Sequence, residues 1–134
     1  IQKICFKLLF FVVAIFCAAV FFVSENLIQI GSSAFLDCKN LKELTIPNSV
    51  KTLRENAFFC ASIDWIVIPD SVTTIEDSAL DGLYFVDIFC EAKSQPTTWP
   101  SNWCSSLSNV YWKDQWEYDS NNKPLLNRDI YPFN

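Results

Sequence analysis

The chain has 134 residues, which is enough for one domain with one continuous core. Its composition, 51% hydrophobic, 16% aromatic and 19% charged, excludes an intrinsically disordered main body. The net charge of -5, with acids and bases interspersed, leaves no basic stripe for a phosphate backbone, so we expect no nucleic-acid partner.

Two residue types are nearly or wholly missing. The sequence contains no histidine, the commonest general base and metal ligand. Glycine occurs only at Gly31 and Gly82, too sparsely for a phosphate-binding loop or a dinucleotide motif. We therefore expect no nucleotide cofactor and no metal.

The N-terminal part, residues 1–22, supports two interpretations. Residues 8–23 contain no polar side chain and follow Lys3 and Lys7, as in a signal peptide or an uncleaved membrane anchor. The same run also echoes a later segment, because residues 14–20 resemble residues 57–63, so it could be a decayed repeat that caps the core. Export or anchoring is the favoured interpretation, and a buried N-terminal cap is the alternative.

Residues 23–90 repeat an apolar pattern about every 22 to 23 residues. Ile-Pro-Asn-Ser-Val at 46–50 returns as Ile-Pro-Asp-Ser-Val at 68–72. The later apolar positions of these two units also correspond, namely Leu53, Ala57, Phe58, Cys60 and Ile63 with Ile75, Ala79, Leu80, Gly82 and Phe85. A looser copy precedes them and consists of Val23, Leu27, Ile30, Ala34, Phe35, Cys38 and Leu41. Three copies predict a solenoid of short parallel strands, turns and short helical returns, whose stacked units share one core.

Each unit begins with a strand pattern. Leu44 and Ile46 alternate with Glu43 and Thr45, and the next unit repeats this alternation at 65–68. The proline that follows lacks an N–H donor and ends the strand, and the Asn-Ser or Asp-Ser after it suits a turn. We therefore predict a parallel stack in which Ile46 and Ile68 occupy equivalent inward positions.

These units, with Ile-Pro-Asn-Ser-Val, Leu53, Ala-Phe and Cys60, resemble the short leucine-rich repeats of BspA-like bacterial surface proteins. The resemblance covers residues 23–90, and the segment from Cys90 to Trp112 is similar to the aromatic segment that closes such arrays. It implies a curved parallel-sheet solenoid, often at the cell surface, that engages protein or matrix partners. The sequence departs from the family pattern at Leu80, where phenylalanine is usual, and at Arg54 and Glu76, where glycine is common.

The outward row of the strands is the predicted binding surface, and it consists of Glu43, Thr45, Trp65, Val67, Asp87 and Phe89. An exposed tryptophan between acids suits a protein contact, and we expect Trp65 to dominate it. The alternative is that these residues only pair across strands, or that another segment covers them.

An enzyme is not expected. Glu43 and Asp87 lie two strands apart, about 9.6 Å, which overlaps the separation of an inverting glycosidase pair. Scattered acids on a sheet produce such pairs by chance, and the serine and cysteine residues lack a base and a Gly-x-Ser-x-Gly turn. No catalytic residue is assigned.

The cysteines allow two disulfides. Cys38 and Cys60 share a repeat position and could be bonded, although two buried thiols are favoured. Cys90 and Cys104 could clip a loop in an exported protein, and the bonded and free states are equally favoured. No cysteine pair has zinc-site spacing.

The repeat fails after Cys90. Residues 91–118 include Trp99, Trp103, Trp112 and Trp116, which predict an aromatic C-terminal cap rather than a carbohydrate-binding platform. Residues 119–134 read as a polar linker or tail.

Taken together, the sequence predicts a non-catalytic protein-interaction or adhesion module, secreted or at the cell surface, with membrane anchoring through residues 8–23 as one option. Its expected partner is a protein or an extracellular matrix ligand. The alternative is a structural spacer or cap from a longer surface repeat protein.

Overall fold

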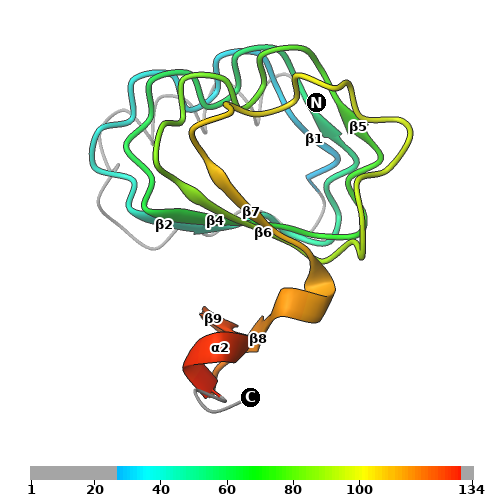
Figure 1. The fold of residues 1–134 in the computed structure, drawn as a ribbon. Helices are drawn as coiled ribbons and strands as arrows, with labels where there is room; N and C mark the ends of the chain where they lie inside the picture. Colours follow the sequence, from blue (N-terminus) through cyan, green and yellow to red (C-terminus); the bar gives the residue numbers. More distant parts are fainter. Residues whose placement is uncertain (1–26, 131–134) are drawn as a thin grey trace.

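The computed structural model describes residues 27–130, which wind into a parallel β-solenoid (Figure 1). One sheet has the order β2-β4-β6-β7 and the other has the order β1-β3-β5. The strands of the first sheet are β2 (Glu43–Thr45), β4 (Trp65–Ile68), β6 (Asp87–Cys90) and β7 (Asn109–Tyr111). Those of the second are β1 (Gln29–Ile30), β3 (Thr52–Leu53) and β5 (Thr74–Ile75). All neighbouring strands in these two sheets are parallel, which confirms the predicted parallel solenoid. Between β1 and β7 the returns consist of turns and short strands, and not of the expected short helices.

The strand register follows the sequence repeat. Glu43 pairs with Trp65, Trp65 with Asp87 and Asp87 with Asn109, so each step along the sheet is 22 residues of chain. Hydrogen bonds between turns continue outside the strands, for example from the Phe58 N–H to the Ala79 carbonyl. The stack therefore satisfies the backbone groups of each turn by pairing them with the next turn.

The inward side chains form continuous buried ladders. Leu44, Ile66 and Ile88 are paired neighbours and lie in one core cluster. Ile46 and Ile68 are both buried in the same cluster, which confirms their predicted equivalence. No single turn encloses its own apolar side chains, because each of them packs against the turns above and below.

The turns also repeat in their backbone angles. A left-handed conformation, with positive φ, recurs at two equivalent sets of positions. The first set is Ser33, Asn56 and Ser78, and the second is Asp37, Cys60 and Gly82. At Gly82 φ is 81°, and an added Cβ would lie 3.2 Å from the Cys60 backbone nitrogen, so glycine fits both the angle and the space.

One predicted core position is wrong. Phe85 was expected to take the place that Ile63 takes in the preceding unit, but it is 79% exposed. Val86 is buried at 2% and joins the core cluster instead. Phe85 also has a φ of 60°, so the chain turns at this residue and directs the next one inward.

The aromatic segment after β6 makes one further turn of the stack. β7 pairs in parallel with β6, and Cys104 forms an isolated parallel bridge with Leu80. Trp99 and Trp103 are buried in the core cluster, and Trp112 packs against it. These three rings therefore close the core, and they are not laid out as an exposed carbohydrate platform.

The chain after the solenoid forms a hairpin and a short helix. A 3-10 turn, η1 (Lys113–Gln115), leads into β8 (Trp116–Tyr118), which pairs antiparallel with β9 (Pro124–Leu126) and is followed by α2 (Asn127–Ile130). In Figure 1 the hairpin and α2 lie outside the ring of the solenoid, on the outer side of the β2-β4-β6-β7 sheet. Part of the predicted polar tail is thus ordered structure.

The predicted signal, anchor or cap at residues 1–22 and the whole apolar run at 8–23 lie outside the described residues. Within residues 27–130, no helix has the length and apolar character needed to cross a membrane.

Candidate interaction surface

The outward side chains of the four-stranded sheet form two ladders. The open ladder consists of Glu43, Trp65, Asp87 and Asn109, which pair in this order across the four strands. The covered ladder consists of Val67, Phe89 and Tyr111, and the exposed Thr45 of β2 continues this row beyond the cover. All six residues of the predicted row are therefore brought together on one face of the sheet.

The covered ladder is closed by the C-terminal hairpin. Val67 and Phe89 are 0% and 4% exposed and form a second apolar cluster with Trp116 and Leu126. The Phe89 ring stacks on Tyr111 and meets Trp116 edge-on, with ring centroids 5.2 Å and 5.4 Å apart. The expectation that Val67 and Phe89 are exposed is wrong. The hairpin of the same chain packs on these apolar side chains and removes them from water.

Two side-chain hydrogen bonds hold the hairpin on the sheet. The Trp116 indole N–H donates to the Cys90 carbonyl at 3.0 Å, and the Tyr118 hydroxyl donates to a Glu91 carboxylate oxygen at 2.7 Å. Burial, the hydrogen bond to Glu91 and the charge of that carboxylate all raise the pKa of Tyr118 above its ordinary value of 10.0. Tyr118 therefore stays a donor to Glu91 at neutral pH.

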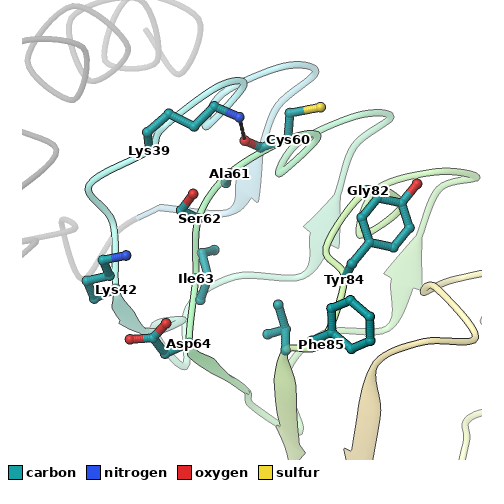
Figure 2. Close-up of a pocket in the computed structure, with 11 residues that line it drawn as sticks. Lys39, Lys42, Cys60, Ala61, Ser62, Ile63, Asp64, Gly82, Tyr84 and Phe85 are labelled. Atoms are coloured by element: carbon teal, nitrogen blue, oxygen red, sulfur yellow. Dashed lines mark hydrogen bonds between the residues drawn. The ribbon is translucent and has the colours of Figure 1, made fainter.

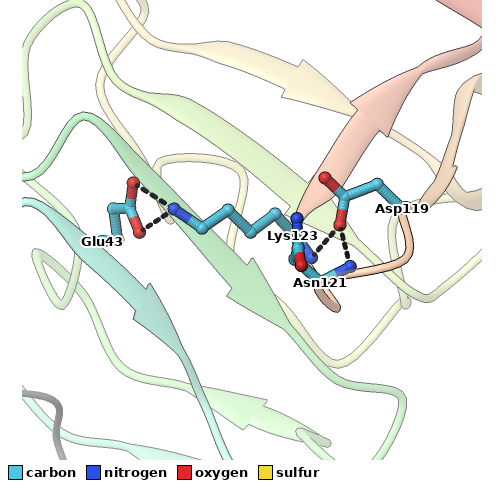
Figure 3. Close-up of polar contacts among 4 residues, drawn as sticks. All are labelled: Glu43, Asp119, Asn121 and Lys123. Carbon is cyan, nitrogen blue, oxygen red and sulfur yellow. Dashed lines mark hydrogen bonds and ion pairs between the residues drawn. The ribbon is translucent and has the colours of Figure 1, made fainter.

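The hairpin turn extends across to the first strand of the sheet (Figure 3). The Asp119 carboxylate accepts the backbone N–H groups of Asn121 and Lys123, at 2.7 Å and 2.9 Å, which fixes the turn. The Lys123 ammonium then contacts both Glu43 carboxylate oxygens, at 3.1 Å and 3.0 Å. The stretch read as a linker is a hairpin turn, a pattern that Asp-Ser-Asn-Asn between two apolar segments could have indicated.

The open ladder presents a tryptophan between two acids. Trp65 is half-buried, because one side of it packs against the hairpin cluster. Asp87 accepts a hydrogen bond from the Asn109 side chain at 2.9 Å, and Glu43 is engaged by Lys123. The carboxylates of Glu43 and Asp87, the pair considered for glycosidase chemistry, thus each have a polar partner. The ladder therefore resembles a contact surface.

The described cysteines show no disulfide between the predicted pairs. Cys60 and Cys104 are partly exposed and unbonded, and Cys90 is buried and unbonded. Burial raises the pKa of Cys104 to about 11, and burial together with the charge of Cys104 raises that of Cys90 further. Within residues 27–130, no group of three or more His, Cys, Asp or Glu residues could hold a metal ion.

A second surface, which the sequence did not indicate, lies on the flank of the solenoid. Four large apolar side chains are exposed there and form what we call the apolar flank: Phe59, Tyr84, Phe85 and Leu107. Beside it runs an open groove of about 520 Å³, with Tyr84 and Phe85 on one side and Lys39 and Lys42 on the other (Figure 2). Phe85 has a left-handed backbone, with φ of 60°, and this conformation costs a residue with a Cβ about 1–2 kcal/mol.

Comparison with known proteins identifies the family of the repeats. A family model described as a BspA-type leucine-rich repeat region of 6 copies matches residues 18–114. The chain belongs to this family. No curated protein and no solved structure gave a significant match.

The BspA-type match ends at residue 114, so the hairpin β8-β9 lies beyond the repeat region. The cover over Val67 and Phe89 is therefore supplied by residues outside the matched repeats. BspA-type repeat regions commonly serve protein interaction or surface adhesion, and they are generally non-enzymatic.

Proposed function

We propose that this BspA-type chain is a non-catalytic interaction module that binds a protein or an extracellular matrix ligand, and that it acts outside the cell or at its surface. The observation that carries the proposal is the open ladder. Four side chains from four successive strands align there in register, and a tryptophan lies near the centre. Tryptophan near the centre of a contact surface, ringed by residues that exclude water, is the usual arrangement of a binding hot spot.

The position of the hairpin defines the extent of this surface. Val67 and Phe89 are covered, so of the sequence-predicted row the proposed contact keeps Glu43, Thr45, Trp65 and Asp87. The hairpin also supplies Lys123, which lies beside Glu43 and adds a cation at the edge of the ladder. The proposed contact is therefore polar at its rim and aromatic at its centre.

The test compares Trp65→Ala with the parent chain in binding to a panel of immobilised matrix proteins. Truncation of a hot-spot side chain costs about 2 kcal/mol or more, so we expect affinity to fall roughly thirtyfold. Because Trp65 packs partly against the hairpin, the variant also loses about 1 kcal/mol of stability, and binding is measured where melting curves show both proteins folded.

The matched control is Ile28→Ala, which truncates another exposed apolar residue, 41% exposed, next to β1 on the other sheet. It should bind like the parent. If folded Trp65→Ala retains full affinity for every matrix protein that the parent binds, the open ladder is not the binding surface.

The covering hairpin favours a second candidate function, that of a structural spacer or cap. A cap needs a closed C-terminal end, and Trp99, Trp103 and Trp116 are all buried near that end. This function replaces the first if the parent chain binds none of the matrix proteins.

A further inference from the structure

The apolar flank presents exposed apolar side chains from successive turns of the solenoid, and the proposed binding function does not use them. Tyr84 is 56% exposed, Phe85 79% and Leu107 52%. The Phe85 N–H donates to the Leu107 carbonyl at 3.3 Å, which joins these residues on adjacent turns. Phe59 reaches the same place, since its ring lies 3.1 Å from a Cβ built on Gly82. Large exposed apolar patches of this kind mark interaction sites on soluble proteins.

Packing within the chain does not explain the position of Phe85. Val86 fills the core position in this turn, so the phenylalanine ring contributes little to the core. Its φ of 60° is unfavourable for a bulky side chain, and the structure keeps the ring outside in that conformation. A strained backbone that presents an aromatic ring to solvent points to a contact made by that ring.

The groove beside the ring carries balanced charge. Lys39 is engaged by Asp37 at 3.5 Å and donates to the Cys60 carbonyl at 2.6 Å. Lys42 and Asp64 are neighbours, because the Asp64 N–H donates to the Lys42 carbonyl at 2.7 Å, and neither forms an ion pair within the described part of the chain. One unpaired cation and one unpaired anion favour an occupant that presents both charges at the same spacing, which a second copy of the same surface does.

We propose that two copies of this chain associate through the apolar flank about a two-fold axis. The Phe85 ring of each copy enters the groove of the other, and Lys42 of each copy faces Asp64 of the other. A two-fold contact uses the same patch on both copies, and a protruding ring next to a groove is self-complementary in this sense. Stable interfaces bury about 800 Å² per partner, and a flank of four large side chains is at the weak end of that range, so we expect a micromolar dimer.

The experiment is sedimentation equilibrium of the full chain from about 1 μM to about 1 mM, a range that covers weak dimers. The parent should form a dimer in this range. Phe85→Ser should raise the dissociation constant roughly thirtyfold or more, as loss of a central aromatic does. Leu125→Ser, which changes an exposed residue of the hairpin, should leave it unchanged. All variants carry the same residues 1–26, so association through that segment is common to them.

Charge reversal tests the predicted pairing. Lys42→Asp and Asp64→Lys should each weaken the dimer, and the double variant should restore it, because the opposite charges again face each other. As a readout without mutation, alkylation of Cys60, which lines the groove, should slow as the dimer forms.

The proposal is overturned if the parent is a monomer throughout the range, if Phe85→Ser associates like the parent, or if the double charge reversal remains as weak as the single variants. Each of these results leaves the Trp65 surface untouched, because matrix binding is measured separately in the Phe85→Ser background. Failure of one surface is therefore distinguishable from failure of the other.

Discussion

Phe58 shows at the scale of one residue how the stack is stabilised. Its ring is fully buried and stacks on Phe35 in the preceding turn, with centroids 4.9 Å apart and planes within 7°. Replacement by alanine removes contacts with both adjacent turns. We expect Phe58→Ala to lower the free energy of unfolding by about 3–5 kcal/mol, measured by urea denaturation.

The matched control is Phe85→Ala, which makes the same chemical change at an exposed ring. It should alter the free energy of unfolding by no more than about 0.5 kcal/mol. A large loss at Phe85 together with a small one at Phe58 would reverse the assignment of the two rings to surface and core.

Gly82 is a residue whose backbone angle decides its identity. With φ at 81°, and with Phe59 and Cys60 3.1 Å and 3.2 Å from an added Cβ, alanine is strained in angle and crowded in space. Gly82→Ala should destabilise the chain by about 1–2 kcal/mol. Thermal melting checks this prediction, and an unchanged midpoint would contradict the left-handed turn.

At the scale of elements, the hairpin β8-β9 is separable from the repeats it covers. The BspA-type match ends at residue 114, and the hairpin meets the sheet through Trp116, Leu126 and the Lys123–Glu43 pair. A chain that ends at residue 114 should keep the parallel solenoid but expose Val67 and Phe89. We expect the strand signal in circular dichroism to fall only by the contribution of β8 and β9, and binding of an apolar dye to increase.

The control for truncation is Lys123→Ala in the full chain. Its ion pair is half-exposed, and such pairs contribute about 1 kcal/mol or less, so the hairpin should stay in place and dye binding should not rise. Unfolding of the truncated chain would show instead that the hairpin is an integral part of the core.

For the molecule as a whole, partly buried acidic groups predict instability at alkaline pH. Burial raises the pKa of Cys104 from 9.0 to about 11 and also raises that of Tyr118 above 10.0. Above pH 9 the unfolded chain therefore holds fewer protons than the folded one, so stability falls as pH rises. The contribution is fully present below pH 9 and is lost progressively above it.

Urea melts at several pH values between about 7 and 11 measure this loss. Cys104→Ala and Tyr118→Phe should each make the decline with pH shallower. A free energy of unfolding that stays constant to pH 11 in the parent would show that these groups are not buried in the folded molecule.

The repeat in the sequence predicts the fold class and most of the inward residues. The return of Ile-Pro-x-Ser-Val after 22 residues sets the register of the strands, because equivalent side chains share a core only when successive turns are stacked in parallel. It also set which side chains face outward, since alternation along a strand is a local property.

Which outward residues are exposed depends on contacts that form only when the chain folds. Val67 and Phe89 are covered because Trp116 and Leu126, which follow them by 27 to 59 positions, fold back over them, and such long-range contacts leave no period in the sequence. Phe85 left its expected core place because one left-handed residue shifted the inward direction to Val86. The sequence repeat determines the strand register and the inward positions that all stacked turns have in common. The burial of each outward side chain depends instead on the segments that pack around it.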